Sequence, residues 1–278
     1  AKLTTYRLSP EEIADVLEHD PRTIRAWQTA LGQKSRSFHL ALCTLIGLTL
    51  TTLQLDELWS YCGRKTQQLW VFIGLESQSK FWLNFELGAR TGATANRLLA
   101  HLVALMPWGF EHFLVITTDK LAAYEKAIAR HLQSVRYAYL QIVKQRRRKR
   151  LVNVKQRLVT GKASDFPPKT KNTSFIERFN LSLRQRISYL QRKTLGYCKR
   201  PAHFQTVLWI NLYDYNYGQC HKSLREEIAM PSGKFQRRYR HLTPAMKMGL
   251  TSMPLEWRQL IVAPIPKNAH QFTTSTNL

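Results

Sequence analysis

Acidic residues are scarce in this chain: 18 aspartates and glutamates stand against 42 lysines and arginines in 278 residues. The formal net charge is therefore +24, and the isoelectric point lies near 10.3. This imbalance argues against a metabolic enzyme with a neutral surface. It favours a polyanionic partner, of which nucleic acid is the commonest. The chain is long enough for one large domain or two smaller ones.

Cysteine is also scarce, and its spacing excludes the common zinc modules. None of the four cysteines forms a CxxC pair or joins histidines at zinc-binding spacing. We therefore expect free thiols in a reducing cytoplasm. The sequence also lacks a P-loop, so no nucleotide cofactor is predicted, and we recognise no signal peptide.

Long apolar runs are nearly absent. The stretch 37–55 carries no formal charge over 19 residues, which is long enough to span a bilayer. It contains His39, Gln54 and four threonines, however, and its pattern changes halfway. We predict a helix over 35–47 that leads into a strand over 50–61, and therefore a cytoplasmic, nucleoid-associated protein without a membrane span.

The first fifty residues have a helical pattern. Ser9-Pro10-Glu11-Glu12 is a capping box with proline in the first helical position. Asp20-Pro21 predicts the start of a second helix, with Ile24, Trp27 and Leu31 on one face and Gly32 at its end. Two short helices joined by a tight turn are typical of a helix-turn-helix, although an ordinary helical hairpin has the same pattern. The predicted outward residues, suited to a DNA major groove, are Arg22, Thr23, Arg25 and Gln28.

From about residue 50 to 142 the pattern predicts strands and helices in alternation. Three strands come first (51–61, 68–75 and 81–87), followed by a helix (93–105), a strand (113–118), a helix (121–131) and a strand (135–143). Three antiparallel strands followed by strand–helix–strand connections form a mixed sheet covered by helices. We therefore predict an α/β fold with a ribonuclease H-like mixed sheet and flanking helices, preceded by a small all-α helix-turn-helix module.

Residues 144–200 carry two thirds of the excess positive charge, with 18 basic and two acidic residues. Residues 144–171 predict a basic linker or arm. Its run from Lys144 to Arg150 has six basic residues in seven and is expected to contact DNA electrostatically. A long helix is predicted over 173–192, with Glu177 on its polar face.

Three carboxylates stand out by position. Asp56 lies inside the first strand, Asp119 follows the fourth strand, and Glu177 is one of the two acids in the basic segment. An acid within an apolar strand is costly unless its charge is compensated, and a divalent metal ion provides this compensation. Two Mg²⁺ ions held by carboxylates are the arrangement that phosphoryl transfer uses. Each acid also has a simpler interpretation: Asp56 as a solvated acid on an edge strand, Asp119 as a helix cap, and Glu177 as an ion-pair partner of Arg178 or Arg184.

Glu57 is the nearest competing acid. Side chains alternate along a strand, so Glu57 is predicted on the face opposite Asp56 and is the less favoured metal ligand.

The chain resembles the DDE transposases of the insertion-sequence-one type. The residues that carry the resemblance are DELWSYCGRK (56–65), ITTDKLAAY (116–124), NTSFIERFNLSLRQRISYLQRKTLGYCK (172–199), YNYGQCHKSL (215–224) and LTPAMKMGLT (242–251). The third is the most specific, and together with the helix-turn-helix the resemblance covers about 5–265. It implies Asp56, Asp119 and Glu177 as catalytic metal-binding acids, two Mg²⁺ or Mn²⁺ ions, and metal-dependent cleavage at transposon ends followed by strand transfer of a 3′-hydroxyl into target DNA.

The same analysis gives the expected DNA contacts and domains. Beside the outward helix-turn-helix residues, the expected contacts are Lys144, Arg146, Arg147, Arg148, Lys149, Arg150, Arg178, Asn180, Arg184, Arg192 and Lys193. The predicted domains are 1–49 (helix-turn-helix), 50–228 (catalytic) and 229–278 (an extension and loose tail). The expected partners are double-stranded DNA, as terminal inverted repeats and as target, and a second copy of the chain, because two DNA ends must be held together.

Two other functions remain open from the sequence. One is a sequence-specific DNA-binding protein with an inactive nuclease fold. The other is a ribonuclease H-like nuclease or resolvase that cleaves DNA without strand transfer.

Overall fold

The computed structural model describes residues 1–107, 112–148, 150–193, 196–228 and 238–264. The chain forms two compact units. The sheet unit is Gly47–Gln205, and the helical unit combines Ala1–Ile46 with Thr206–Leu278. The domain boundaries predicted from the sequence, after 49 and after 228, stay predictions, and the compact units divide the chain at different places. No helix within the described residues is both long and apolar enough to cross a membrane.

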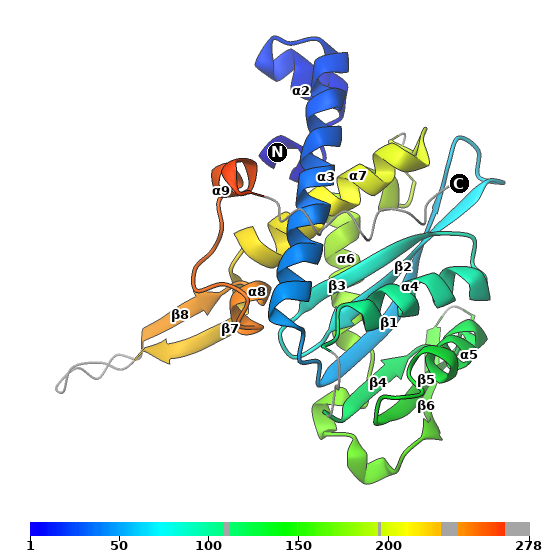
Figure 1. Ribbon diagram of the computed structural model, residues 1–278. Helices are drawn as coiled ribbons and strands as arrows, with labels where there is room; N and C mark the ends of the chain where they lie inside the picture. The colour runs from blue at the N-terminus through cyan, green and yellow to red at the C-terminus, as the bar shows by residue number, and fades with distance from the viewer. Residues whose placement is uncertain (108–111, 149, 194–195, 229–237, 265–278) are drawn as a thin grey trace. The chain divides into compact units, whose positions relative to one another are not determined.

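The sheet unit is built on one six-stranded mixed sheet in the order β3-β2-β1-β4-β5-β6 (Figure 1). β1 lies parallel to β4 and β4 parallel to β5, and the other neighbours are antiparallel. The strands are β1 (Thr52–Tyr61), β2 (Gln68–Glu76), β3 (Phe81–Gly88), β4 (Leu114–Thr118), β5 (Tyr137–Arg147) and β6 (Arg150–Thr160). The mixed α/β fold predicted from the sequence is confirmed, and the first four strands agree with the prediction to within one residue.

Helices cover both faces of this sheet. On one face, α4 (Gly92–Ala104) brings Leu102 so close to Gly74 that a side chain at position 74 would collide with it. On the same face, Tyr124 of α5 (Ala122–His131) packs edge-on against Phe72. On the opposite face, Phe179 of α6 (Ser174–Arg186) packs against Trp82. These buried apolar contacts fix the helices that carry the polar residues described below.

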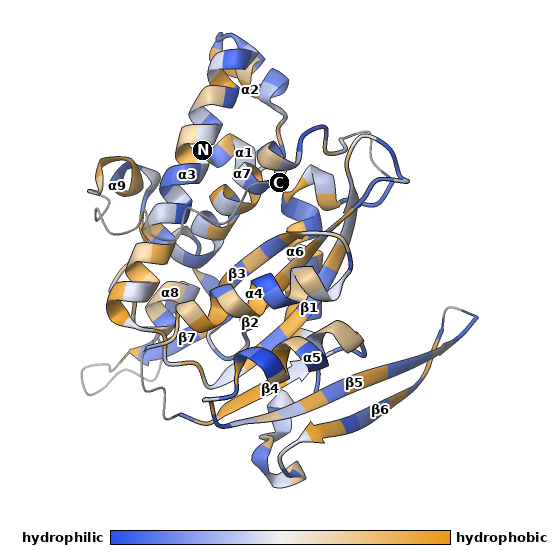
Figure 2. Ribbon diagram, turned by 45° about the vertical axis from the view of Figure 1, so that its right-hand side comes forward, coloured by the Kyte–Doolittle hydropathy of each residue, from blue (hydrophilic) through white to orange (hydrophobic). Residues whose placement is uncertain are grey.

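Within the basic segment 144–171 the predicted linker is wrong, because residues up to Thr160 form strands, and the basic arm stays a prediction. Its first part completes β5, and Arg150–Thr160 pairs with β5 as the antiparallel edge strand β6. Gly161, with φ of +88°, ends the hairpin, and η1 (Ala163–Asp165) and η2 (Pro168–Thr170) follow. Nearly all of β6 is solvent-exposed. Its charged side chains stay in water, so their charge does not oppose strand pairing. Figure 2 shows β5 and β6 side by side, with hydrophilic and hydrophobic residues mixed along both.

The helix that carries Glu177 is shorter than predicted. α6 ends at Arg186, where Ile187 adopts an extended backbone conformation with φ of −122° and ψ of 113°. A short 3-10 turn, η3 (Ser188–Leu190), follows in place of further α-helix. Ile187 and Leu190 are nevertheless buried, as the apolar spacing predicts.

The helical unit begins with α1 (Lys2–Thr5), α2 (Pro10–Leu17) and α3 (Pro21–Ile46). The predicted capping box at Ser9 and Glu12 is present. The Asp20 carboxylate accepts a hydrogen bond from the backbone N–H of Arg22, at 2.6 Å, as expected of the residue that caps α3.

The predicted end of the second helix at Gly32 is wrong, because α3 continues to Ile46. Gly32 serves a different purpose. A Cβ at this position would lie 2.8 Å from the side chain of Thr206, so glycine allows close packing against α7 (Pro201–Tyr213). The predicted apolar face is also displaced: Ile24 is buried, but Trp27 is 52% exposed.

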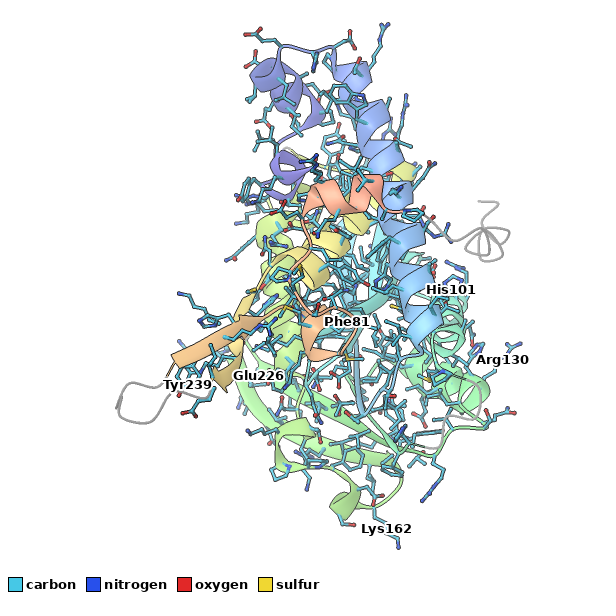
Figure 3. All side chains as sticks on the ribbon, turned by 60° about the vertical axis from the view of Figure 1, so that its left-hand side comes forward. Phe81, His101, Arg130, Lys162, Glu226 and Tyr239 are labelled. Carbon is cyan, nitrogen blue, oxygen red and sulfur yellow. The ribbon has the colours of Figure 1, made fainter. Side chains whose placement is uncertain are left out.

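The rest of the helical unit consists of short elements after α7. They are η4 (Asp214–Gly218), β7 (His221–Ile228), β8 (Arg238–Leu242), α8 (Pro244–Lys247) and α9 (Trp257–Val262). β7 and β8 form an antiparallel hairpin that bears Glu226 and Tyr239 (Figure 3). A cluster of aromatic rings joins α3 to this part of the chain, and within it the Tyr217 hydroxyl lies 2.9 Å from His39 Nδ1.

Candidate active site

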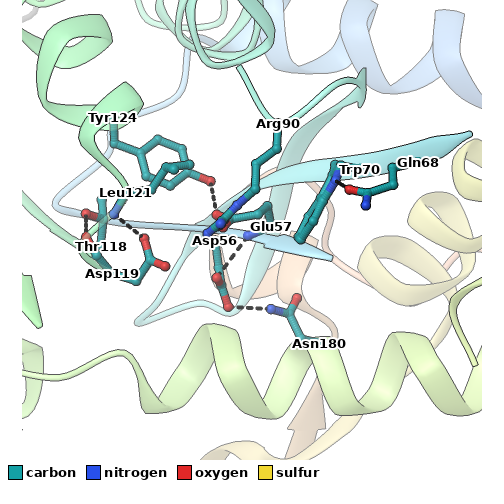
Figure 4. Close-up of polar contacts among 10 residues, drawn as sticks. All are labelled: Asp56, Glu57, Gln68, Trp70, Arg90, Thr118, Asp119, Leu121, Tyr124 and Asn180. Carbon is teal, nitrogen blue, oxygen red and sulfur yellow. Dashed lines mark hydrogen bonds and ion pairs between the residues drawn. The ribbon is translucent and has the colours of Figure 1, made fainter. Parts of the chain in front are cut away.

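Two of the three predicted acids are brought together by the parallel pairing of β1 with β4. Leu55 and Thr118 are the last residues paired between these strands. Asp56 and Asp119 are the next residues on each strand, so the register places both carboxylates at the same level of the sheet (Figure 4). The apolar runs before them, which fix the two strands in the core, therefore also fix the spacing of the acids.

Asp56 lies on the face of the sheet that α6 covers. Its Oδ1 accepts from the backbone N–H of Glu57 at 2.9 Å, and its Oδ2 accepts from Asn180 Nδ2 at 2.7 Å (Figure 4). Burial raises the pKa of Asp56 to about 7, with further contributions from the negative charges of Glu57 and Asp119. A cation bound beside these carboxylates would relieve their mutual repulsion, which adds to the effect of burial on the pKa.

Asp119 follows the C-terminal end of β4. Its Oδ1 accepts from the backbone N–H of Leu121 at 2.9 Å, so it also shapes the turn into α5. Burial raises its pKa, while the positive charges of Arg90 and Lys144 oppose the rise. The local turn contact and a metal-binding role are therefore compatible in one side chain.

Glu177 lies in the first part of α6, where the helix dipole favours negative charge. It forms an ion pair with Lys144 of β5 and accepts a hydrogen bond from the Thr173 hydroxyl. The partner proposed from the sequence, Arg178 or Arg184, is thus replaced by a lysine from another element.

Glu57 projects to the opposite face from Asp56, as strand alternation predicts. Its carboxylate forms an ion pair with Arg90, whose Nε lies 2.8 Å from Oε1, and accepts from the Tyr124 hydroxyl at 3.2 Å (Figure 4). It still lies near the other acids. One carboxylate oxygen from each of Asp56, Glu57 and Asp119 lies within 4.8 Å of the others, close enough to share an ion.

All three predicted acids line one open cavity of about 520 Å³. The lining combines carboxylates with cations and amides, which is the chemistry expected of a site for a metal ion and a phosphate group. The other polar residues in the lining are Glu57, Lys120, Lys144, Thr173, Asn180, Arg184 and Arg192.

The cavity takes in some of the predicted DNA-contacting residues and not others. Lys144, Arg184 and Arg192 line it, and Arg184 Nη1 donates to the Leu190 carbonyl oxygen at 3.2 Å. Asn180 also lines it, but its side chain is held by Asp56 and only 6% of the residue is exposed. This contact indicates a positioning role for Asn180 in place of the predicted phosphate contact.

The remaining basic residues of this unit lie outside the cavity lining. Arg178 is exposed, and its charge acts on Lys80, whose pKa it lowers after the larger effect of burial. Lys193 is exposed beyond η3. Arg147, Arg148 and Arg150 are exposed at the end of the β5–β6 hairpin. Lys149 and the side chain of Arg146 lie outside the described part of the chain.

The predicted DNA-facing residues of the helical unit are not all on an outward face. Arg22 is exposed, Thr23 is half-buried, and Arg25 is exposed and paired with Glu11 of α2. Gln28 is only 5% exposed, and its Nε2 donates to Thr4 Oγ1 at 3.0 Å, so its predicted outward position is wrong. α1 packs where the sequence predicts a free helix face.

Three residues of the site were not predicted from the sequence: Arg90, Tyr124 and Thr173. Arg90 follows β3, and Tyr124 is a buried tyrosine on an otherwise apolar helix face. Thr173 directly precedes α6, where a threonine normally indicates a helix cap. Its hydroxyl instead donates to Glu177. Of the three, Tyr124 and Thr173 have a local sequence pattern that could have identified them, and Arg90 does not.

The order of the strands and the helices on both faces, with Asp56 in the middle of β1 and Asp119 directly after β4, define a ribonuclease H-like domain. Residues 49–164 match the family model described as IS1 transposase. The match contains Asp56 and Asp119 and ends before Glu177. Over this region the chain is similar to the IS1 transposases.

Individual relatives agree with this assignment. The chain is 27% identical over 164 residues to the Insertion element IS1 protein InsB of Shigella sonnei, an alignment that covers 58% of this chain and 95% of the relative. It is also 27% identical over 164 residues to the Insertion element IS1 9 protein InsB of Escherichia coli strain K12 and to InsB of Haemophilus ducreyi. Each of these alignments covers 58% of this chain and 75% of the relative.

Proposed function

We propose that this protein is an active DDE transposase. Asp56, Asp119 and Glu177 direct metal-dependent cleavage at the ends of a transposon, and the freed 3′-hydroxyl then attacks target DNA. The observation that carries the proposal is the meeting of these three acids, from two strands and a helix, in one cavity that also holds Lys144, Arg184 and Arg192.

The residues of this cavity fit divalent metal ions. Mg²⁺ and Mn²⁺ prefer oxygen ligands, and the carboxylates of Asp56, Glu57 and Asp119 approach one another closely enough to supply them. The buried Oδ1 of Asn180 has no hydrogen-bond partner among the described residues and adds an acceptor beside Asp56. We propose Asp56, Asp119 and Glu177 as ligands of two ions. When bound, these ions activate a water or a DNA hydroxyl and neutralise the charge that develops on the phosphate.

The surrounding side chains hold the ligands in place and bind phosphate. Asn180 orients the Asp56 carboxylate by donating to Oδ2. Arg90 contacts Oε1 of Glu57 and Tyr124 contacts Oε2, so both oxygens of that carboxylate have partners, and we propose Asp56 as the ligand from β1. The Arg184 and Arg192 guanidiniums are suited to bind the phosphates that flank the scissile bond, because their planar forks match phosphate oxygens.

Two further surfaces are proposed to bind duplex DNA. One is the end of the β5–β6 hairpin, with Arg147, Arg148 and Arg150. The other is the α2–α3 region, with Arg22 and Arg25 as its exposed cations. The α2–α3 region is proposed to recognise the terminal repeats, and the end of the hairpin is proposed to bind phosphates without sequence preference. Because two transposon ends must be joined together, we propose at least a dimer on DNA.

The test is a cleavage and strand-transfer assay on DNA that bears the element's own terminal inverted repeats. We expect activity with Mg²⁺ or Mn²⁺ and none with EDTA. Asp56→Asn, Asp119→Asn and Glu177→Gln are each expected to abolish both steps while DNA binding persists. Gln185→Ala, an exposed change on α6 outside the cavity lining, is the matched control and should keep strand transfer.

The outcomes separate the alternative functions. Metal-dependent cleavage without joining, on DNA that lacks repeat ends, would identify a nuclease or resolvase. Tight DNA binding with no metal-dependent reaction would identify a DNA-binding protein with an inactive fold. Full strand transfer by any one of the three acid variants would remove that residue from the proposed site.

A further inference from the structure

Lys144 is separated by the fold from the basic run to which it belongs in the sequence. It lies on β5 opposite Val154 of β6, before the end of the hairpin that bears Arg147, Arg148 and Arg150. Its side chain is 28% exposed and lines the cavity, where its ammonium group forms an ion pair with Glu177. Lys144 is therefore the basic residue of that run that reaches the acids among those the structure describes.

Its charge also acts on the second acid. The positive charge of Lys144 lowers the pKa of Asp119, against the larger effect of burial. The ammonium group thus lies within range of two of the three proposed metal ligands. Thr173 donates a hydrogen bond to the same Glu177 oxygen that Lys144 contacts. Both contacts are therefore on Oε1 of Glu177.

We propose that the Lys144 ammonium is the resident cation of Glu177 in the metal-free protein, that it competes with a divalent ion for this carboxylate, and that it moves to a DNA phosphate when the ion binds. The inference rests on the proposed metal-dependent function. A lysine is suited to this exchange because its charge is compact and its four-carbon stem is flexible. A divalent ion near Glu177 and Asp119 would repel the ammonium, whereas a phosphate brought into the same cavity would attract it.

The exchange predicts that metal and DNA assist each other's binding. Without metal, Lys144 is held by Glu177 and contributes little to DNA affinity. With metal, it is released and adds one phosphate contact. Linkage requires the converse: DNA that holds Lys144 must tighten metal binding by the same factor. A purely structural ion pair between β5 and α6 would give neither effect.

The first measurement is Mn²⁺ binding to the full chain without DNA, by calorimetry or by the electron paramagnetic resonance of free Mn²⁺. Lys144→Gln should bind Mn²⁺ roughly tenfold more tightly than the wild type, since a unit charge a few ångströms from the ion opposes binding. Lys144→Arg keeps the charge and should stay within about threefold of the wild type. Arg147→Gln, at the hairpin end, is the matched control and should leave Mn²⁺ affinity unchanged. The Lys144→Gln effect should disappear in a Glu177→Gln background.

The second measurement is the salt dependence of DNA binding, with Ca²⁺ or with EDTA. Lys144→Gln should reduce the slope of log affinity against log salt by about one with Ca²⁺ and hardly at all with EDTA. Arg147→Gln should reduce it by about the same amount under both conditions.

Equal or weaker Mn²⁺ binding by Lys144→Gln would overturn the exchange and leave the transposase proposal standing. Failure of the wild type and all variants to bind Mn²⁺ would instead remove the metal site itself, and the exchange with it. If Lys144→Gln does not fold, a Lys144→Arg protein whose salt slope is the same with Ca²⁺ and EDTA would overturn the exchange.

Discussion

Replacing the Asp56 carboxylate is expected to make the metal-free protein more stable. Asp56 is ionised only at a cost, because burial and three neighbouring acids raise its pKa from 3.8 to about 7. The unfolded chain ionises the same group near its ordinary value. Each pH unit of difference corresponds to about 1.4 kcal/mol, so the full cost at pH 8 is about 4 kcal/mol.

The sign of the pH dependence follows from the direction of the pKa change. Below about pH 4, Asp56 is protonated in both states and costs nothing. Between about pH 4 and pH 7, the unfolded state is ionised and the folded state is not, so wild-type stability falls as pH rises. Above about pH 7, the whole cost is present. Asp56→Asn lacks this ionisation, and its advantage over the wild type should therefore grow by about 2.7 kcal/mol between pH 5 and pH 8.

The asparagine also has partners in place. Its Oδ1 can still accept from the Glu57 N–H, as the Asp56 Oδ1 does. Its Nδ2 would face Asn180, whose Oδ1 has no partner among the described residues. A flip of the Asn180 amide turns that oxygen toward the new donor. One polar atom of the Asn180 amide therefore stays without a partner, as in the wild type, with Nδ2 in the place of Oδ1.

The assay is urea unfolding of the full chain in EDTA at pH 5 and pH 8, followed by tryptophan fluorescence. Asp15→Asn, an exposed change on α2, is the control and should show no pH-dependent advantage. Addition of Mg²⁺ at pH 8 should stabilise the wild type and leave Asp56→Asn unchanged. The reasoning is refuted if Asp56→Asn is less stable than the wild type at pH 8, or if its advantage is the same at both pH values.

Three further changes test other parts of the structure. Asn180→Ala removes the donor to Asp56 and should weaken Mg²⁺ binding by about 10–100-fold in calorimetry, whereas an unchanged affinity would show that Asp56 needs no orientation by Asn180. Arg147→Gln combined with Arg150→Gln at the hairpin end should reduce the salt slope of DNA binding by about two, and an unchanged slope would place the DNA elsewhere. Ile24→Ala should destabilise the helical unit by about 2–5 kcal/mol in urea unfolding, but Trp27→Ala by about 0.5 kcal/mol or less, and the reverse order would contradict the observed helix face.

The sheet could be predicted because its central strands carry their information locally. β1, β2 and β4 are runs of apolar residues bounded by turn residues, and buried strands of this kind stand out in any sequence. β6 has no such pattern, since nearly every residue in it is exposed. It forms a strand because its backbone pairs with the edge of β5. The basic composition of the segment does not indicate this pairing.

The errors in the helical unit have a tertiary cause. Gly32 is a common helix terminator, yet its place in the middle of α3 is explained by the approach of Thr206, which is 174 positions away in the sequence. Gln28 is buried because Thr4 of α1 supplies a hydrogen-bond partner, and this leaves Trp27 at the surface. Local spacing identifies the helix but not the neighbour that decides which face is inside.

In the candidate site, too, the sequence indicates the functional residue types but not the residues that contact them. Three acids in otherwise apolar or basic segments are conspicuous in the sequence, because each is costly where it stands. Their partners are not conspicuous. Lys144 reaches Glu177 only because β5 runs parallel to β4 and places the two on one side of the cavity. A basic run of six residues in seven predicts phosphate binding for all of them equally, whereas the fold gives one lysine an acid and leaves Arg147, Arg148 and Arg150 to the solvent. The contact of Lys144 with Glu177 therefore depends on the sheet topology. The composition of the basic run does not distinguish Lys144 from the arginines beside it, so the proposed exchange between carboxylate and phosphate could not be predicted from composition.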